Sequence, residues 1–181
     1  MSSRTLTLMA AAALSLTCGL AAAQNPSGSL DESMTYVANT VTSLGAVSFT
    51  GQVHDSSNNQ SWSYSRTVTI SNFRPDPASC TLYFHFNEVT PGNTPTDKDG
   101  WIPFRQVQQV KVVTLDEEVN EITAKQGHPT WLVSHSPEIY VVSAIRPDGT
   151  TNDLDFYDLA RAQQVAVALR RATSLCGGGL G

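Results

Sequence analysis

A run of strict alternation between residues 60 and 71 constrains the fold of this chain more than any other stretch. Trp62, Tyr64, Val68 and Ile70 stand at even positions, whereas every odd position from 61 to 71 holds a serine or a threonine. Successive side chains of a strand point to opposite faces of a sheet, so the pattern predicts a strand with one buried and one solvated face. This arrangement is typical of antiparallel sheets.

Further short strands are expected before and after this one. A first strand runs from Ala46 to about Asp55, and a polar turn over residues 56–60 leads into the alternating strand. The segment Arg74–Pro77 is expected to break the sheet, because proline has no backbone N–H for a sheet ladder. The other strands are expected over residues 79–89, 101–105, 108–115, 131–134, 139–146 and 154–157, with a loop over 91–100 and an acidic connection over 116–125 that has room for a helical turn.

A helix is expected near the start of the mature chain. Ser29 and Glu32 have the spacing of a capping box, in which each side chain accepts a hydrogen bond from the other residue's backbone N–H. Gly45 suits the left-handed conformation that ends many helices. Between these two signals, apolar residues recur at spacings of four and three and form one face: Leu30, Met34, Val37, Val41 and Leu44.

The segment Asn152–Cys176 predicts a short strand that runs into a second helix and closes the core. The apolar positions of this helix are Leu159, Ala162, Ala166, Leu169 and Ala172. About seven strands in one flat sheet would leave long exposed edges, which a bent sheet or a closed barrel avoids. The expected fold is therefore α+β: a curled antiparallel sheet or partly closed barrel of about seven strands, with an N-terminal helix and a C-terminal capping helix.

The first residues have the pattern of a secretory signal peptide. Arg4 lies in a short basic region, residues 6–16 are apolar, and residues 21–23 are alanines that a signal peptidase accepts. The apolar run is shorter than the roughly 20 residues that a bilayer span requires. Residues 1–23 are therefore expected to be cleaved near Ala23, which leaves residues 24–181 as a single domain, exported to the periplasm or the medium. A lipoprotein attached at Cys18 is the alternative, but the residues before Cys18 fit a lipobox poorly.

Charge and cysteine content narrow the partners and the compartment. Without Arg4, the net charge of the chain falls from −5 to −6. Nucleic acids and anionic membranes are bound by basic patches, so neither is an expected partner. Two cysteines remain after cleavage, Cys80 and Cys176, and in an exported chain an even pair indicates a disulfide bond. Two free buried thiols are the alternative.

Two stretches resemble strands of pleckstrin-homology-like (PH-like) domains. Residues 102–113 are similar to a consecutive pair of their strands, and Asn152–Phe156 with the helix that follows is similar to their last strand and helix. The resemblance implies a curled seven-strand sheet whose open end is plugged by the C-terminal helix. Members that bind phosphoinositides carry several Lys and Arg after the first strand. The corresponding segment His54–Gln60 has no basic residue, so no phosphoinositide-type headgroup is expected.

The mature chain also resembles a family of uncharacterised, exported bacterial proteins. That resemblance implies no activity. The residues that carry it are 76–80, 97–101, 127–131 and 175–178.

No motif in the sequence predicts catalysis or metal binding. The four histidines lack metal-ligand spacing, and the pair His54–Asp55 has no G-x-S-x-G nucleophile to accompany it. The segment Asp97–Gly100 resembles part of a calcium loop, but the outer ligand positions fail, so it is interpreted as a turn. Asp153 and Asp155 face the same way and could bind a cation or act as acid and base, but capping of the following helix and interaction with its dipole explain them better. No cofactor is expected.

The expected function is an exported, non-enzymatic binding or scaffolding module of the cell envelope. Its partner would be an unknown protein or another envelope component. The loop Gly127–Trp131 is the most unusual one, because it places a histidine and a proline next to a tryptophan. A small secreted hydrolase or metal-dependent enzyme, and a carrier of a small apolar ligand, are the alternatives. The residues expected at a contact surface are His128, Trp131, Trp101, Asp97 and Asp99.

Overall fold

The computed structural model describes residues 28–179, which form eight strands and three α-helices. The expected signal peptide with its cleavage point near Ala23, and the alternative lipid attachment at Cys18, lie outside these residues. In chain order the elements are α1 (Leu30–Leu44), β1 (Ala46–Asp55), β2 (Gln60–Asp76), β3 (Thr81–Val89), β4 (Thr96–Pro103), a short 3-10 helix (Phe104–Gln106), β5 (Gln109–Thr114), α2 (Leu115–Lys125), β6 (Trp131–Ser136), β7 (Tyr140–Ile145), β8 (Thr151–Phe156) and α3 (Leu159–Leu175).

The N-terminal helix α1 begins and ends where the sequence predicts. The Glu32 side chain accepts a hydrogen bond from the Ser29 backbone N–H at 2.7 Å, and the Ser29 hydroxyl accepts one from the Glu32 N–H at 3.3 Å. Gly45 ends the helix with a φ of 66°, a conformation that suits glycine. Met34, Val37, Ala38 and Val41 are buried along the predicted apolar face.

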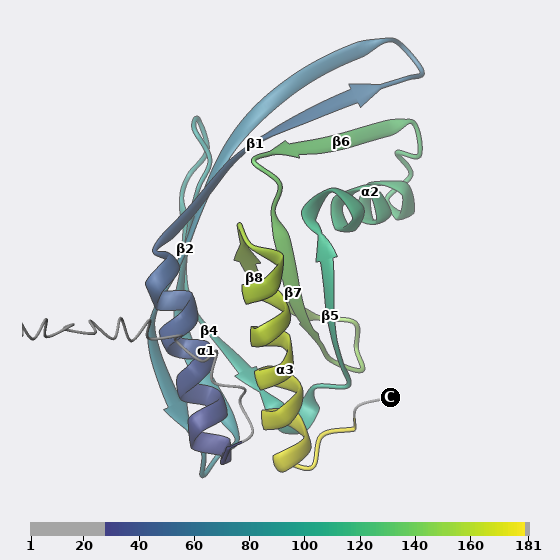
Figure 1. Cartoon of the computed structure of the whole chain (residues 1–181). Coiled ribbons are helices and arrows are strands. Elements are labelled where there is room, and N and C mark those ends of the chain that lie inside the picture. The colour runs from purple at the N-terminus through teal and green to yellow at the C-terminus, as the bar shows by residue number, and fades with distance from the viewer. Residues whose placement is uncertain (1–27, 180–181) are drawn as a thin grey trace, which may run out of the picture.

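The fold is α+β with antiparallel strands, as expected, but the strands form two sheets instead of one curled sheet or partly closed barrel. Five strands pair in the order β4-β3-β2-β1-β6, and three pair in the order β5-β7-β8. Figure 1 shows the five-stranded sheet bending over one side of the molecule, with the three-stranded sheet facing it. No strand pairing joins the two sheets anywhere in residues 28–179, so the described part of the chain has no closed barrel.

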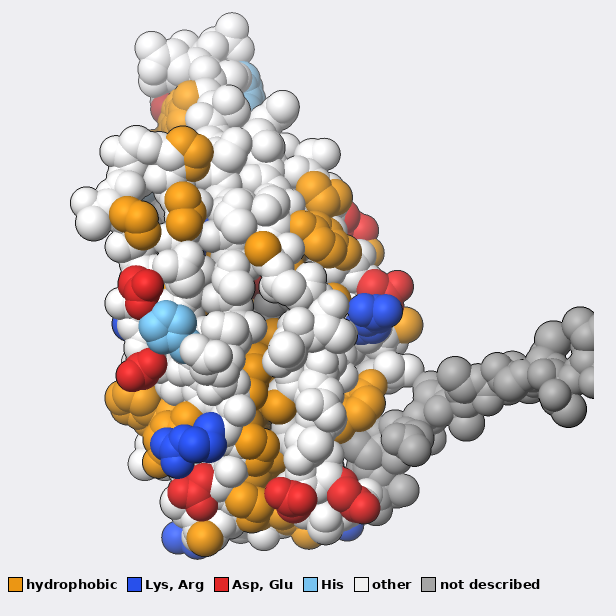
Figure 2. Space-filling view, turned by 90° about the vertical axis from the view of Figure 1, so that its left-hand side faces the viewer, with side chains coloured by type: hydrophobic (Ala, Val, Ile, Leu, Met, Phe, Trp, Pro, Cys, Tyr) orange, Lys and Arg blue, Asp and Glu red, His pale blue; other side chains and the backbone are white. Residues whose placement is uncertain are grey.

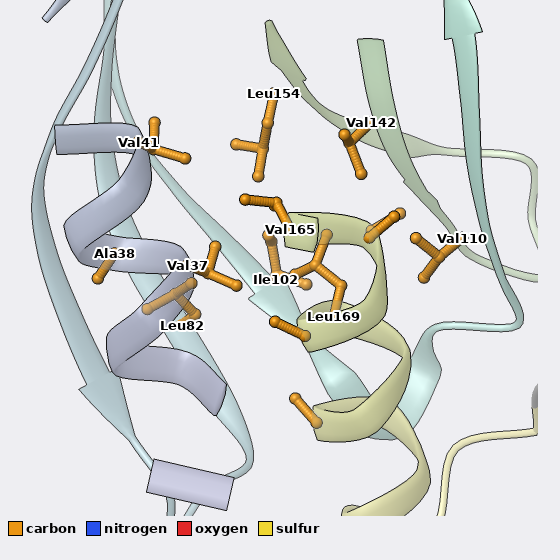
Figure 3. Close-up of a cluster of buried hydrophobic side chains, with 14 of the residues drawn as sticks. Val37, Ala38, Val41, Leu82, Ile102, Val110, Val142, Leu154, Val165 and Leu169 are labelled. Carbon is orange, nitrogen blue, oxygen red and sulfur yellow. The ribbon is translucent and has the colours of Figure 1, made fainter. Parts of the chain in front are cut away.

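The helices explain why the sheets stay separate. α1 packs on β2 of the five-stranded sheet, α3 packs on all three strands of the other sheet, and α1 packs on α3. The helix pair therefore fills the space that barrel closure would need. Figure 3 shows the resulting core, in which side chains of α1 and α3 lie among those of both sheets, Leu82 and Ile102 on one side and Val142 and Leu154 on the other.

The two cysteines connect α3 to the turn before β3. The Sγ atoms of Cys80 and Cys176 lie 2.21 Å apart and their Cα atoms 5.9 Å apart, which places the pair at disulfide distance as expected. Cys176 caps the C-terminus of α3. Cys80 is buried, but it stands in the turn with a φ of 57° rather than on the face of the expected strand. The link joins the end of α3 to the five-stranded sheet.

One local prediction is incomplete and two are wrong. The acidic connection, in which a helical turn was expected to fit, is the full helix α2, and it begins with a capping box of Thr114 and Glu117. The segment Arg74–Pro77 was expected to break the sheet, but β2 continues through it as far as Asp76. The register of β2 against β3 shifts just before this segment, between Ser71 and Arg74. The segment Asp97–Gly100 is part of the edge strand β4, not a turn.

None of the helices in residues 28–179 is long and apolar enough to cross a bilayer.

Candidate functional site

A cleft of about 940 Å³ lies between the two sheets and is bordered by α2. We call it the inter-sheet cleft. One wall is the inner face of the five-stranded sheet, and the other is the face of the three-stranded sheet that points away from α3. Its lining residues are Phe49, Arg66, Val68, Phe84, Phe86, Lys98, Asp99, Gly100, Trp101, Gln109, Lys111, Leu115, Glu118, Val119, Glu121, Ile122, Lys125, Ile145, Arg146, Gly149, Thr151, Asn152, Asp153 and Asp155.

The three-stranded sheet presents polar side chains to the cleft through its register. Lys111 on β5, Ser143 on β7 and Asp153 on β8 stand opposite one another in one row across the sheet. Asp155 lies two residues further along β8 and therefore on the same face. Because the side chains alternate, the residues between them point toward α3 and belong to the main core: Val110, Val142, Ala144 and Leu154.

The five-stranded sheet contributes aromatic rings and basic side chains. Arg66 on β2 forms an ion pair with Glu88 on β3. The ring of Phe84 lies against β4 at Gly100, where an added Cβ would stand 2.4 Å from the ring, so this position requires glycine. The Lys98 ammonium lies 5.5 Å from the centroid of the Phe86 ring, within cation–π range.

The helix α2 adds carboxylates along one border of the cleft. Glu118 accepts a hydrogen bond at 3.2 Å from the Ser143 hydroxyl, which lies on the floor of the cleft. Glu121 forms an ion pair with Lys125 one turn later. Leu115 and Val119 on the same helix pack with Phe49 in a smaller apolar cluster beside the cleft. The border is therefore apolar at one end and charged along its length.

Three side-chain N–H groups with almost no accessible surface have no hydrogen-bond partner among residues 28–179: Arg66 Nε, Arg146 Nε and Asn152 Nδ2. Thr173 on α3 holds the one other unpaired buried side-chain atom in this part of the chain. A buried donor without an acceptor costs about 1–3 kcal/mol, and such donors are rare in folded proteins. All three residues border the cleft, but Asn152 shares the α3 face of β8 with Leu154, and protein atoms enclose the three N–H groups.

Two carboxyl groups of the cleft, those of Asp155 and Glu118, hold protons more tightly than free carboxyls. Asp155 keeps some solvent exposure as a residue, yet protein atoms enclose its carboxyl. This burial raises the pKa of Asp155 to about 7, although Arg66 acts against the shift; the nearby Asp153, Glu118 and Glu88 add to it. Burial also raises the pKa of Glu118, and the charge of Asp153 contributes. Near neutral pH the Asp155 carboxyl can thus donate as well as accept hydrogen bonds.

The residues expected at a contact surface fall in two separate places. Asp97, Asp99 and Trp101 lie on β4, whereas Trp131 begins β6 and His128 precedes it; β4 and β6 are opposite edges of the five-stranded sheet. Asp99 and Trp101 border the inter-sheet cleft, but Asp97, His128 and Trp131 do not.

At the β6 edge the aromatic residues stack. The ring of His128 lies parallel to that of Trp131 at a centroid distance of 4.0 Å. Trp62 on β2 meets Trp131 edge-on at 5.1 Å. Trp62 retains 41% exposure, so the predicted buried face of this strand is only half covered at its outer end. The cluster supports the end of the β1–β2 hairpin.

At the β4 edge the two aspartates bind His85. Asp97 Oδ1 lies 2.9 Å from His85 Nε2, and Asp99 Oδ1 lies 3.1 Å from His85 Nδ1. The hydrogen bond to Asp99 is the main cause that raises the pKa of His85. Figure 2 looks onto this outer face, where one histidine side chain stands between two acidic ones on a largely uncharged polar surface. Both ring nitrogens are engaged by the carboxylates.

A second histidine forms a buried network that the sequence analysis did not identify. His135 Nδ1 lies 2.6 Å from Asp116 Oδ1, and His135 Nε2 lies 2.7 Å from the Tyr64 hydroxyl. Tyr64 reaches His135 across β1 at Gly51, where a Cβ would stand 2.3 Å from the tyrosine ring. Burial raises the pKa of Tyr64. The three side chains connect β2, β6 and α2.

The polar side chains that the three-stranded sheet turns to the cleft were not predicted from the sequence as one group. Capping was offered as an explanation of Asp153 and Asp155, but the cap of α3 is Asp158, which accepts a hydrogen bond from the Arg161 N–H at 2.8 Å. The available signal was the alternation of aspartates with Leu154 and Phe156, which predicts two opposite faces of one strand.

Comparison with known proteins adds no relative: no protein-family model, no curated protein and no solved structure matches this chain.

Proposed function

We propose that this protein is an exported, non-enzymatic binding module of the cell envelope that holds a small polar ligand in the inter-sheet cleft. The observation that carries the proposal is the inter-sheet cleft itself, which measures about 940 Å³ and is lined by aromatic rings and by charged residues of both signs. Such a lining offers a small ligand apolar surface together with hydrogen-bond donors and acceptors.

The size and lining of the cleft agree with a small ligand. Pockets for small molecules typically measure about 300–1,000 Å³ and combine apolar surface with a few polar groups. This cleft measures about 940 Å³ and includes the rings of Phe49, Phe84 and Phe86. Such rings can pack against the apolar parts of a ligand while the charged border orients its polar groups.

The charges of the cleft favour a polar ligand over an apolar one. Five basic and five acidic residues border it, and all of them except Asp99, which turns to His85 on the outer face, offer the cleft a charged side chain; an apolar ligand would desolvate these groups without compensation. The balance of signs also favours a ligand that carries both donors and acceptors. The lining residues with a formal charge are Arg66, Lys98, Asp99, Lys111, Glu118, Glu121, Lys125, Arg146, Asp153 and Asp155.

Native mass spectrometry of protein purified from the cell envelope tests the proposal. We expect an additional mass on the native protein that is lost on denaturation. Lys111→Met combined with Asp153→Asn removes two charged groups from the row of side chains that faces the cleft, so it should abolish the additional mass. Arg171→Met on the exposed side of α3 is the matched control and should retain the ligand. A wild-type protein that binds nothing, even after incubation with envelope extract, would contradict the proposal.

A small acid–base enzyme is a second candidate, favoured by one observation. Burial raises the pKa of Asp155 to about 7, and a general acid works best with a pKa near the operating pH. The mass of the co-purified ligand before and after incubation decides between the two functions. A mass that changes with the wild type but not with Asp155→Asn would identify an enzyme, and an unchanged mass would support the binding module.

Export and family membership are further parts of the proposal. The cysteine pair at disulfide distance supports an oxidising compartment such as the periplasm. Analysis of the mature N-terminus should give Gln24, and a retained Met1 would refute cleavage. We further propose that the fold is a variant of the PH-like arrangement, which the bent sheet and the C-terminal helix support, and that the chain belongs with the exported bacterial proteins that it resembles.

A further inference from the structure

We propose that the outer edge of β4 binds an extended segment of another protein as an added antiparallel strand, with basic side chains of that segment opposite Asp97 and Asp99. This interaction goes beyond the small-ligand binding proposed for the cleft and does not depend on it. The inference is based on how the edges of the two sheets are covered. An uncovered strand edge carries unpaired N–H and C=O groups, with which an extended peptide can form a further strand.

Side chains cover two other edges of the five-stranded sheet. At β6, Asn120 on α2 accepts a hydrogen bond from the Val133 N–H at 2.7 Å and donates one to the Val133 carbonyl at 2.9 Å. At the start of β1, which β6 does not reach, the Tyr157 hydroxyl accepts from the Ser48 N–H at 2.6 Å and donates to the Ser48 carbonyl at 3.0 Å. Each side chain takes the place that a neighbouring strand would occupy.

The edges of the three-stranded sheet are partly covered as well. At β5, Arg170 on α3 donates a hydrogen bond to the Val110 carbonyl at 2.7 Å. At β8, Asp155 borders a hollow of about 10 Å³ together with Val47 and Val68 of the five-stranded sheet. A further strand would lie about 4.7–4.9 Å from its neighbour, and the hollow beside Asp155 has no room for one.

The edge of β4 has no such cover among residues 28–179. The Phe104 N–H donates to the Cys80 carbonyl at 2.9 Å, one residue beyond the last pair of β3 and β4. Because bonded and outward-facing residues alternate along an antiparallel ladder, the N–H and C=O groups of Asp97, Asp99 and Trp101 turn away from β3. No turn, loop or cap contact in residues 28–179 reaches these groups. All three residues are exposed, so a partner strand has access to them.

The side chains of this edge define the chemistry of the partner. His85 holds the carboxylates of Asp97 and Asp99 in place on the outer face, and their side chains remain 63% and 90% exposed. Basic side chains directly opposite would attract them, whereas acidic ones would be repelled. Trp101 is 51% exposed on the same face and offers contact to an aromatic side chain. Charged edge residues also discourage pairing with apolar strands, so they favour a basic partner.

A second copy of this chain would not provide such a partner strand. The basic residue of β4, Lys98, lies on the cleft face near the Phe86 ring, so it cannot stand opposite an aspartate of the outer face. A symmetric pair centred on Asp99 would place two Asp99 carboxylates opposite each other. A pair centred on Gly100 would place Asp99 opposite Trp101 of the second copy. Charge complementarity therefore favours a different, basic segment.

The probe is an N-acetylated octapeptide amide of sequence TVYVKTKT. In antiparallel register its tyrosine falls opposite Trp101 and its two lysines fall opposite Asp99 and Asp97. We expect NMR titration of the folded protein to give a Kd of about 100 μM or tighter. Amide hydrogen exchange should slow at these three residues, whose N–H groups would then be bonded. The control peptide TVYVETET should bind at least about tenfold more weakly, because its glutamates are repelled.

Backbone methylation of the probe tests strand pairing separately from charge. The N–H groups of the two lysines would face β4, so N-methylation at both should abolish binding. N-methylation of the valine and the threonine on either side of the first lysine changes N–H groups that face away, and should leave binding within about threefold of the unmodified probe. Equal effects of the two methylation patterns would overturn the inference on the wild-type protein, without need of any variant.

Charge reversal connects binding to this edge. Asp97→Lys combined with Asp99→Lys should invert the preference, so that TVYVETET binds at least about tenfold more tightly than TVYVKTKT. Asp31→Lys combined with Glu138→Lys changes the net charge equally at exposed positions outside β4 and should keep the wild-type preference.

Three other results would overturn the inference: equal binding of the two peptides, protection of amides elsewhere, or no binding at about 1 mM peptide. Protection of the β4 amides without peptide, at rising protein concentration, would also overturn it and would identify a second copy as the occupant. None of these results alters the additional mass expected for the cleft, so the proposed function is tested separately.

Discussion

The two faces of the three-stranded sheet differ in chemistry although they share the same strands. On the face toward α3, Leu154 and Phe156 are fully buried in the main core. On the opposite face, Asp153 and Asp155 from the same strand line the inter-sheet cleft. β7 is covered on both sides, since Val142 and Ser143 are both fully buried. α3 packs on one face of the three-stranded sheet, whereas the inter-sheet cleft separates the other face from the five-stranded sheet.

The difference shows how one sheet contributes to the core on one face and to an open cleft on the other. A strand alternates its side chains, so neighbouring residues can serve the core and the cleft independently. α3 covers one face with small and branched residues, whereas the five-stranded sheet stands away from the other and leaves about 940 Å³ between them. Substitutions one residue apart should therefore have opposite consequences.

Loss of the cysteine link should weaken the core face most. The link joins α3 to the five-stranded sheet across a sequence separation of 96 residues. In the chain-entropy model a loop of that size contributes about 4–5 kcal/mol. Replacement of both Cys80 and Cys176 by alanine should lower the free energy of unfolding by that amount, measured with urea. An unchanged unfolding midpoint would mean that packing alone holds α3 on the sheet. The predicted contribution of the cysteine link to the core face would then be wrong.

Truncation on the core face of β8 should cost more than truncation on the cleft face. Leu154 is fully buried, so Leu154→Ala should reduce the free energy of unfolding by about 2–5 kcal/mol. The neighbouring Asp153 is exposed, and Asp153→Ala should stay within about 0.5 kcal/mol of the wild type. Urea titrations of the two variants provide the measurement. Similar losses in both would show that the cleft face also bears on stability.

On the cleft face, Asp155→Asn should stabilise the protein in a pH-dependent manner. The folded pKa of about 7 exceeds the ordinary value of 3.8, so the folded state holds the proton more tightly. The carboxyl therefore costs stability progressively as the pH rises from about 4 to 7, and the full shift corresponds to about 4 kcal/mol. Partial solvent access reduces this to about 2 kcal/mol.

Urea titrations near pH 4 and pH 8 test this. The variant and the wild type should have the same pH dependence below pH 4, and the variant should be the more stable one at pH 8. Asp153→Asn is the matched control on the same strand. A gap that is equal at both pH values would contradict an enclosed Asp155 carboxyl.

The elements of the fold were largely predictable, and their assembly was not. α1 was predicted from its capping box and apolar spacing, and the alternation of β2 predicted its two faces. α2 has an equivalent capping box at Thr114 and Glu117, but its acidic surface suggested a connection instead. The division into two sheets depends on α1 packing on α3, a contact between opposite ends of the chain that no local pattern encodes.

The candidate site was mostly hidden from the sequence for the same reason. Asp155 and Glu118 become a site only when β8 and α2 meet over Ser143, which depends on strand register. The unpaired state of Arg66 Nε depends on the Glu88 pairing of the same guanidinium and on burial, neither of which is visible in composition. The aromatic contact residues Trp131 and Trp101 were noticed because tryptophans are rare, but they lie at opposite sheet edges.

The smallest expected effect concerns an exposed polar cluster that contrasts with the enclosed one in the cleft. His85 lies between Asp97 and Asp99 on the outer face of the five-stranded sheet. The hydrogen bond to Asp99 raises the pKa of His85, so the folded state favours the protonated ring. That contribution is fully present below the ordinary pKa of 6.5 and is lost as the pH rises through the raised folded value.

His85→Gln should therefore destabilise the protein slightly near pH 5.5 and have almost no effect near pH 8.5, the opposite pH trend to Asp155. NMR titration of the imidazole should show the raised pKa, and Asp99→Asn should return it toward 6.5 because the largest cause is removed. Solvent screens this cluster, so the stability change should remain below that of Asp155→Asn. A larger change in the free energy of unfolding for His85→Gln than for Asp155→Asn would mean that solvent exposure does not determine how strongly the two clusters affect stability. Low solvent access in the cleft would then no longer explain the raised pKa of Asp155.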